Sequence, residues 1–188
     1  MPITNLTELA SFLASAYGAG WTYTVQNVEA EVKRADGYGI AIALLNTRHG
    51  IAFVVGGLWP IDQLGRSYEP DIKPILTVLA SLTPAQIDAQ LQSIFFLQYE
   101  PLWLVQKALV DRNDGTLTNY DAFLRDVSTR SGATLTLEAT GIYGLSLNRT
   151  GTVLNTRTVI RGDQAQISFQ SLPFHEYETL INEFLNVR

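Results

Sequence analysis

Residues 38–58 read YGIAIALLNTRHGIAFVVGGL, and this stretch decides the fold class. Two apolar runs, 38–45 and 51–58, flank a polar segment from Asn46 to Gly50. Neither run reaches the roughly 20 apolar residues that a membrane-spanning helix requires. Apolar runs of this length, bounded by turn residues, are typical of buried strands. We therefore predict a hairpin of two central strands that are covered on both faces.

The residues before this hairpin predict a helix and another strand region. Apolar side chains follow helical spacing over residues 4–17. Apolar and polar side chains then alternate over 21–34, with a change of parity at Gln26–Asn27 that indicates a bulge or bend. Asp36–Gly37 is a turn signal. We expect strands at 21–34, 38–46 and 50–58.

The middle of the chain predicts helices separated by breaks. Residues 72–82 are expected to form a short helix, and Thr83 followed by proline marks the start of another. Pro101 is expected to interrupt that helix near Tyr99. The conformation of residues 102–110 stays open between helix and strand.

The last third predicts a turn, a helix, four strands and a final helix. Residues 111–115 (DRNDG) have turn composition, and Thr118 is expected to begin a new helix. Short alternating segments then predict strands at 133–140, 142–148, 152–161 and 164–171. A final helix is expected from about Phe174 to Asn186.

Successive strands joined by tight turns imply antiparallel pairing and an α+β fold. We predict one domain over residues 1–188, built on an antiparallel sheet of about seven strands with helices packed on one face. Both halves show the order helix, strands, helix. An internal duplication of residues 1–100 and 115–188, giving two pseudo-symmetric halves, is therefore an open alternative.

The composition excludes several classes of chemistry. The chain has no cysteine and only two histidines among 188 residues, so we expect no metal site and no cofactor. Its net charge of −5 disfavours nucleic-acid binding, which requires clustered basic residues. Neither a secretory signal nor a membrane span is recognised, so we expect a cytoplasmic protein that does not bind membranes. No catalytic motif is present, and no catalytic residue is predicted.

The segment from Trp59 to Asp71 is the candidate binding site. It is punctuated by prolines, and long loops of this kind often carry function. Aromatic side chains next to an arginine and carboxylates can anchor a partner or line a ligand pocket. The residues assigned to this site are Trp59, Arg66, Tyr68, Glu69 and Asp71. The competing interpretation is a structural loop attached to the core by Trp59 and Tyr68.

Three functions stay open at this level. Charged residues are only 16% of the chain and aromatic residues 10%, which suits a surface with extensive apolar contacts. The first hypothesis is therefore a non-enzymatic binding or adaptor protein, chaperone-like or homodimeric, that acts through protein–protein contacts. The second is a small-molecule-binding protein or an enzyme with a site near residues 59–71. The third is a structural component of a larger assembly.

Overall fold

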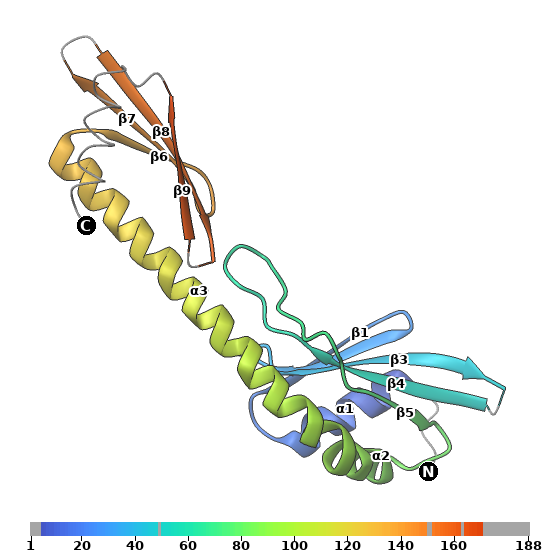
Figure 1. The fold of residues 1–188 in the computed structure, drawn as a ribbon. Coiled ribbons are helices and arrows are strands. Elements are labelled where there is room, and N and C mark those ends of the chain that lie inside the picture. The colour runs from blue at the N-terminus through green and yellow to red at the C-terminus, as the bar shows by residue number, and fades with distance from the viewer. Residues whose placement is uncertain (1–4, 49, 150–151, 163, 171–188) are drawn as a thin grey trace. The chain divides into compact units, whose positions relative to one another are not determined.

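The computed structural model describes residues 5–48, 50–149, 152–162 and 164–170. The chain divides into two compact units, residues 1–110 and 111–188 (Figure 1). The described part has two antiparallel sheets, of five and four strands, and one long helix. The α+β class is thus confirmed, whereas the single sheet of about seven strands was wrong. The single domain and the internal duplication stay predictions.

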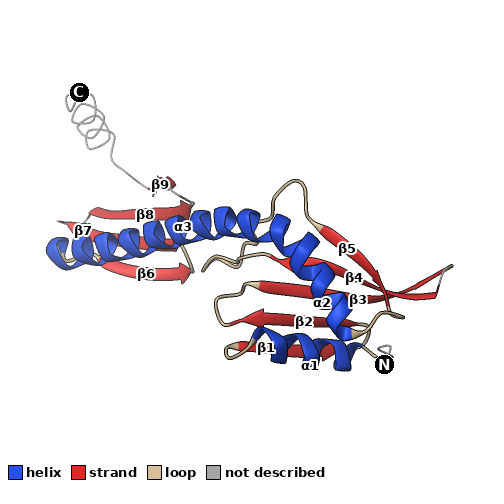
Figure 2. Cartoon of the chain, turned by 90° about the horizontal axis from the view of Figure 1, so that it is seen from below, coloured by secondary structure: helices blue, strands red, loops and turns tan. Residues whose placement is uncertain are grey.

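The first unit begins with a helix, and a five-stranded sheet follows it. Helix α1 (Leu6–Tyr17) is capped by Asn5, whose side-chain oxygen accepts the Glu8 N–H at 2.8 Å. The strands are β1 (Trp21–Gln26), β2 (Glu29–Arg34), β3 (Gly39–Thr47), β4 (Gly50–Leu58) and β5 (Ile75–Leu79). They pair in chain order and antiparallel, so β1 and β5 form the two edges (Figure 2).

The predicted 38–58 hairpin is present as β3 and β4, which are central in the sheet. Ile40 and Ile42 of β3 are fully buried on one face, in the same cluster as Leu9 of α1. The other face carries small side chains such as Ala41 and Ala43, which are only half-buried. The core of the first unit therefore lies on one face of its sheet, and the second face is only partly covered.

The 21–34 segment contains two strands, which is the first reason why the strand count exceeds the prediction. Gln26 pairs directly with Glu29 across a tight turn. Asn27 takes a left-handed conformation in this turn, with φ of 54°, which asparagine tolerates better than most residues. The change of parity at this point therefore marks a hairpin rather than a bend within one strand.

Strand β5 is the second reason why the structure has more strands than predicted. Its residues were predicted as part of a helix over 72–82, and that prediction was wrong. Pro74 precedes the strand, and the run from Ile75 to Leu79 contains β-branched isoleucine, threonine and valine. Such residues fit a pleated surface better than a helix. The strand pairs with β4 from Gly56 to Ala52, and this tertiary pairing decides its conformation.

Three consecutive helical segments follow β5. Helix α2 (Pro84–Gln90) begins at Thr83 as predicted, with a reciprocal capping box between Thr83 and Gln86. A π-helical turn, η1 (Leu91–Phe95), leads directly into α3 (Phe96–Ser131).

Helix α3 is continuous where the sequence predicted breaks. It passes through Pro101, and residues 102–110 are helical. The proline removes the hydrogen bond to the carbonyl of Leu97. Leu97 is exposed, so water can reach that side of the helix and the loss is tolerated.

The predicted turn at 111–115 and the helix start at Thr118 were also wrong, since both lie inside α3. The Thr116 hydroxyl donates to the Arg112 carbonyl at 2.9 Å, and the Thr118 hydroxyl donates to the Asp114 carbonyl at 3.0 Å. These threonines bond back to their own helix instead of capping a new one. Local turn composition is therefore overridden by helix continuity in this segment.

The second unit has a meander of four antiparallel strands. They are β6 (Thr134–Ala139), β7 (Ile142–Arg149), β8 (Thr152–Arg161) and β9 (Gln164–Gln170), paired in chain order. Leu117 and Leu124 of α3 are buried, as are Tyr143 and Ile160 of the sheet. These four strands match the four predicted for this region. The helix predicted at 174–186 lies outside the described residues.

Candidate functional site

The loop that joins β4 to β5 contains the sequence-predicted site, and its backbone is hydrogen-bonded to itself. The Tyr68 N–H donates to the Pro60 carbonyl at 3.0 Å, and the Asp62 N–H donates to the Arg66 carbonyl at 3.1 Å. Ile61 and Ser67 form an isolated antiparallel bridge between these two bonds. The first part of the loop is therefore a narrow hairpin with a defined conformation.

Asp62 holds the tip of this hairpin together and is only 5% exposed. Its Oδ1 accepts the backbone N–H groups of Leu64 and Arg66, both at 2.9 Å. Its Oδ2 accepts Arg66 Nε at 2.8 Å and the Tyr68 hydroxyl at 3.0 Å. Burial by itself raises the pKa of the Asp62 carboxyl, but the hydrogen bonds from Arg66 and Tyr68 lower it below its ordinary value.

The predicted site residues do not converge on one point. Arg66 and Tyr68 meet at the Asp62 carboxylate, whereas the Trp59 ring packs edge-on against Tyr99 at 5.2 Å. Glu69 forms an ion pair with Lys73 within the loop. The remaining member of the predicted set, at position 71, is exposed. The contacts of the loop explain its shape, and a binding role for its predicted residues stays a prediction.

Replacing Asp62 by asparagine tests this structural account. Because the folded-state pKa of Asp62 is lowered, its contribution to stability is fully present above its unfolded-state pKa of about 4. That contribution is lost as the pH falls through the lower folded-state value. We expect D62N to lower the free energy of unfolding by about 1–3 kcal/mol at about pH 7 and by less at about pH 3. Urea unfolding at both pH values measures the difference.

Glu69→Gln is the matched control, because it neutralises a carboxylate of the same loop. Glu69 and Lys73 are both partly exposed, and exposed ion pairs contribute less than about 1 kcal/mol. A D62N protein that is as stable as E69Q at neutral pH would contradict the assigned role of Asp62.

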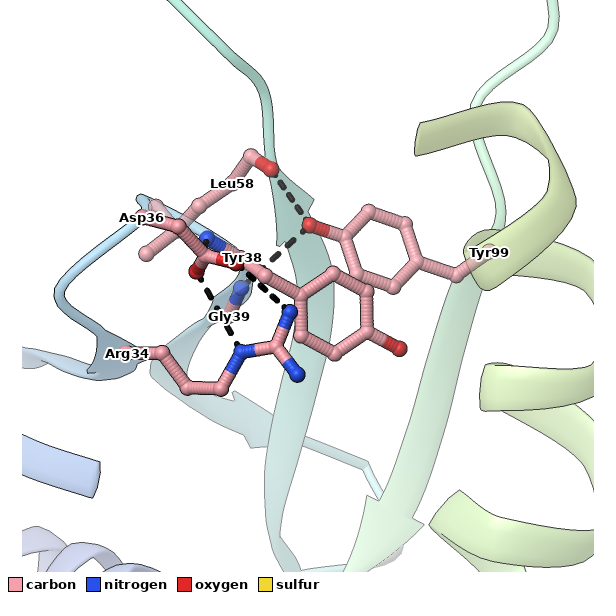
Figure 3. A network of polar contacts seen from close by, with 6 residues as sticks. All are labelled: Arg34, Asp36, Tyr38, Gly39, Leu58 and Tyr99. Carbon is pink, nitrogen blue, oxygen red and sulfur yellow. Dashed lines mark hydrogen bonds and ion pairs between the residues drawn. The ribbon is translucent and has the colours of Figure 1, made fainter. Parts of the chain in front are cut away.

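A second network connects the β2–β3 turn to helix α3 (Figure 3). Arg34 forms a bidentate pair with Asp36, at 3.2 and 2.7 Å, and Asp36 Oδ1 also accepts the Tyr38 N–H at 3.1 Å. The Arg34 guanidinium lies 4.6 Å from the centroid of the Tyr38 ring. Tyr38 in turn stacks on Tyr99 at 5.1 Å. The predicted Asp36–Gly37 turn is confirmed, and it positions Tyr38 over the helix.

The Tyr99 hydroxyl makes a polar contact between α3 and the five-stranded sheet (Figure 3). It donates to the Leu58 carbonyl and accepts the Gly39 N–H at 3.5 Å. Gly39 and Leu58 are paired directly across β3 and β4, so one hydroxyl satisfies both strands. Sequence analysis missed Tyr99. The available signal was the spacing of Phe95, Tyr99 and Trp103 by four residues, which places three aromatic rings on one helix face.

Strand β5 is an edge strand of the five-stranded sheet, and its outer side carries exposed apolar side chains. The Ala80 N–H donates to the Ile51 carbonyl, so Ala80 and Ile51 form a hydrogen-bonded pair. The alternation of an antiparallel ladder then leaves the backbone groups of Ile75, Thr77 and Leu79 directed away from β4. In the described structure no further strand pairs with β5. Ile75 is 67% and Leu79 45% exposed, so the open backbone and the exposed side chains coincide.

In the described residues no group of three or more histidine, aspartate or glutamate side chains is arranged to hold a metal ion. None of the described helices contains a stretch long and apolar enough to cross a membrane. Comparison with models of known families, with curated proteins and with solved structures gives no match to this chain.

Proposed function

We propose that this chain is a non-enzymatic binding or adaptor protein that acts through protein–protein contacts. The partner adds a strand to the open edge of β5, and it is either another polypeptide or a second copy of this chain. The observation that carries the proposal is the coincidence of unpaired backbone groups and exposed apolar side chains at Ile75, Thr77 and Leu79. Strand addition of this kind gains affinity from main-chain hydrogen bonds and specificity from alternate side chains.

The composition of β5 supports this proposal. Natural edge strands usually carry charges, prolines or bulges that prevent pairing with other chains. The strand Ile75–Leu79 reads ILTVL and has none of these within its bounds. The opposite edge strand β1 is also uncharged, but its residues on the same outer face are the polar Thr22, Thr24 and Gln26. The sheet therefore has an edge with an apolar outer face on one side only, which favours a specific strand partner there.

Thr77→Lys tests the proposal, because it places a charge in the middle of the open edge at an exposed position. If the partner is a second copy, light scattering after gel filtration is expected to give a dimer mass for the unmodified chain and a monomer mass for T77K. If the partner is another polypeptide, a protein captured from the native lysate is expected to be lost with T77K.

Thr24→Lys is the matched control, since it makes the same change on the exposed outer face of the other edge strand. It is expected to retain the dimer or the captured partner. The proposal is wrong if the unmodified chain is monomeric and T77K captures the same proteins as the unmodified chain. It is also wrong if T24K and T77K reduce association equally.

A further inference from the structure

Four aromatic rings of the first unit form a closed circuit next to helix α1. Tyr17 contacts Trp21 with ring centroids 4.8 Å apart, and Trp21 contacts Tyr38 at 5.9 Å. Tyr38 contacts Phe96 at 6.1 Å, and Phe96 contacts Tyr17 at 5.7 Å, which completes the circuit. The same four rings line an open hollow of about 360 Å³. This hollow does not involve the edge of β5.

The charges around the hollow are mainly negative. Glu100 lies on its lining with Gln92, and both follow the spacing of Phe96 by four residues. Glu100 is exposed, and within the described residues it makes no hydrogen bond or ion pair that would neutralise it. Burial and then the charge of Glu100 raise the pKa of Tyr38 to about 12. The hydroxyl therefore stays neutral near pH 7, and the ring experiences the negative field of Glu100.

Tyr17, another ring of the circuit, lies near a second carboxylate. Burial and then the charge of Asp88 raise the pKa of the Tyr17 hydroxyl. Its oxygen is buried, and the side chains of Asp88 and Gln92 also act on its pKa through hydrogen bonding. Two carboxylates thus act on the rings, Asp88 from α2 and Glu100 from α3.

Arg34 shows that these rings already accept one cation on their faces. Its guanidinium lies 4.6 Å from the Tyr38 centroid and 5.9 Å from the Trp21 centroid. Arg34 is paired with Asp36 at 2.7 Å, so its charge is locally balanced. It is not among the residues that line the hollow, and the negative charge of Glu100 remains available to a second cation.

We propose that this hollow binds a methylated ammonium group, carried either by a free small molecule or by a trimethylated lysine of another protein. Aromatic faces attract a cation through their quadrupoles, and recognition of quaternary ammonium groups is their best-known use. A primary ammonium needs acceptors for three N–H donors when it leaves water. The lining is mainly aromatic, and its side-chain acceptors are Glu100, Gln92 and the hydroxyls of Tyr17 and Tyr38. A quaternary ammonium has no donors to satisfy, so the aromatic lining suits it better.

The experiment titrates the full chain with choline and with 3,3-dimethylbutan-1-ol, its neutral isostere, and follows binding by calorimetry. Choline is expected to bind at least about fivefold more tightly than the isostere, because only the charge differs. Peptides with trimethyllysine or unmodified lysine form the second arm. Tighter binding of the trimethyllysine peptide than of choline assigns the group to a protein, and the reverse order assigns it to a free molecule.

Two variants locate the binding. Glu100→Gln removes the exposed carboxylate on the lining and is expected to weaken choline binding about threefold or more. Glu29→Gln makes the same substitution at an exposed position of β2 that does not line the hollow, and it is expected to leave binding unchanged. Tryptophan fluorescence checks that both variants remain folded. Equal affinity for choline and its isostere overturns the proposal, as does absence of binding in both arms or an unaltered affinity in E100Q.

Discussion

Gly57→Ala is expected to destabilise the first unit by about 1–3 kcal/mol, the usual cost of overpacking a core. A Cβ atom at Gly57 would lie 2.2 Å from Cε2 and 2.5 Å from Cδ2 of the Tyr99 ring. The ring cannot move away easily, because its hydroxyl is held by Leu58 and Gly39. The substitution therefore forces α3 away from the sheet or pushes Tyr99 out of its position.

Gly56→Ala is a control that differs by one residue and by one face of the sheet. Successive residues of a strand face opposite sides, and a Cβ atom at Gly56 meets no atom within 4 Å. We expect G56A to be neutral or to stabilise by up to about 1 kcal/mol, since alanine reduces the entropy of the unfolded chain.

Denaturant unfolding followed by tryptophan fluorescence measures both variants. All three tryptophans, Trp21, Trp59 and Trp103, lie in residues 1–110, so the signal reports on the first unit alone. Equal denaturant midpoints for G57A and G56A would show that the Tyr99 ring does not pack directly against Gly57.

The strands could be predicted from the sequence wherever a local pattern agreed with the tertiary pairing. The 38–58 hairpin is such a case, because two apolar runs meet at a turn and then pair with each other. Asp36–Gly37 is another, since Gly37 supplies the positive φ of 87° that the turn requires. In these segments the nearest partner in sequence is also the partner in space.

The sequence failed where a distant contact decides the conformation. Residues 75–79 have an apolar pattern that a short helix also satisfies, and only pairing with β4 makes them a strand. The residues from Asp111 to Thr118 have turn composition, yet they continue a helix that began at Phe96. The hydroxyls of Thr116 and Thr118 donate to backbone carbonyls of the same helix, and local propensity does not predict these bonds.

The candidate sites also depend on contacts that the sequence pattern does not show. Arg66 and Tyr68 were predicted as binding residues, but their common partner is Asp62, six or fewer positions away in the same loop. The aromatic circuit joins residues 17, 21, 38 and 96, which no local pattern connects. Such a site forms only when α1, the sheet and α3 come together. Its members could be recognised individually as core aromatics, but not as a group.

Tyr99→Ala is expected to cost about 3–5 kcal/mol, which is typical of removing a fully buried aromatic side chain. The ring contacts Tyr38, Trp59 and Phe95, with centroids 5.1–5.3 Å away. Its loss therefore leaves a cavity at the centre of the aromatic core. Tyr99→Phe keeps the ring and removes only the hydroxyl, so we expect a smaller loss of about 1–3 kcal/mol from the unpaired Leu58 carbonyl.

Combining the two substitutions tests whether Gly57 and Tyr99 are in contact. In a Tyr99→Ala background the methyl group of Gly57→Ala no longer meets a ring and instead fills part of the cavity. We expect G57A to cost little or to stabilise in that background, with a coupling energy of about 1–3 kcal/mol between the two sites. The G56A/Y99A pair should be additive, because Gly56 faces the other side of the sheet. Additive free energies for G57A/Y99A would refute the direct contact and, with it, the account of why this strand has glycine at position 57.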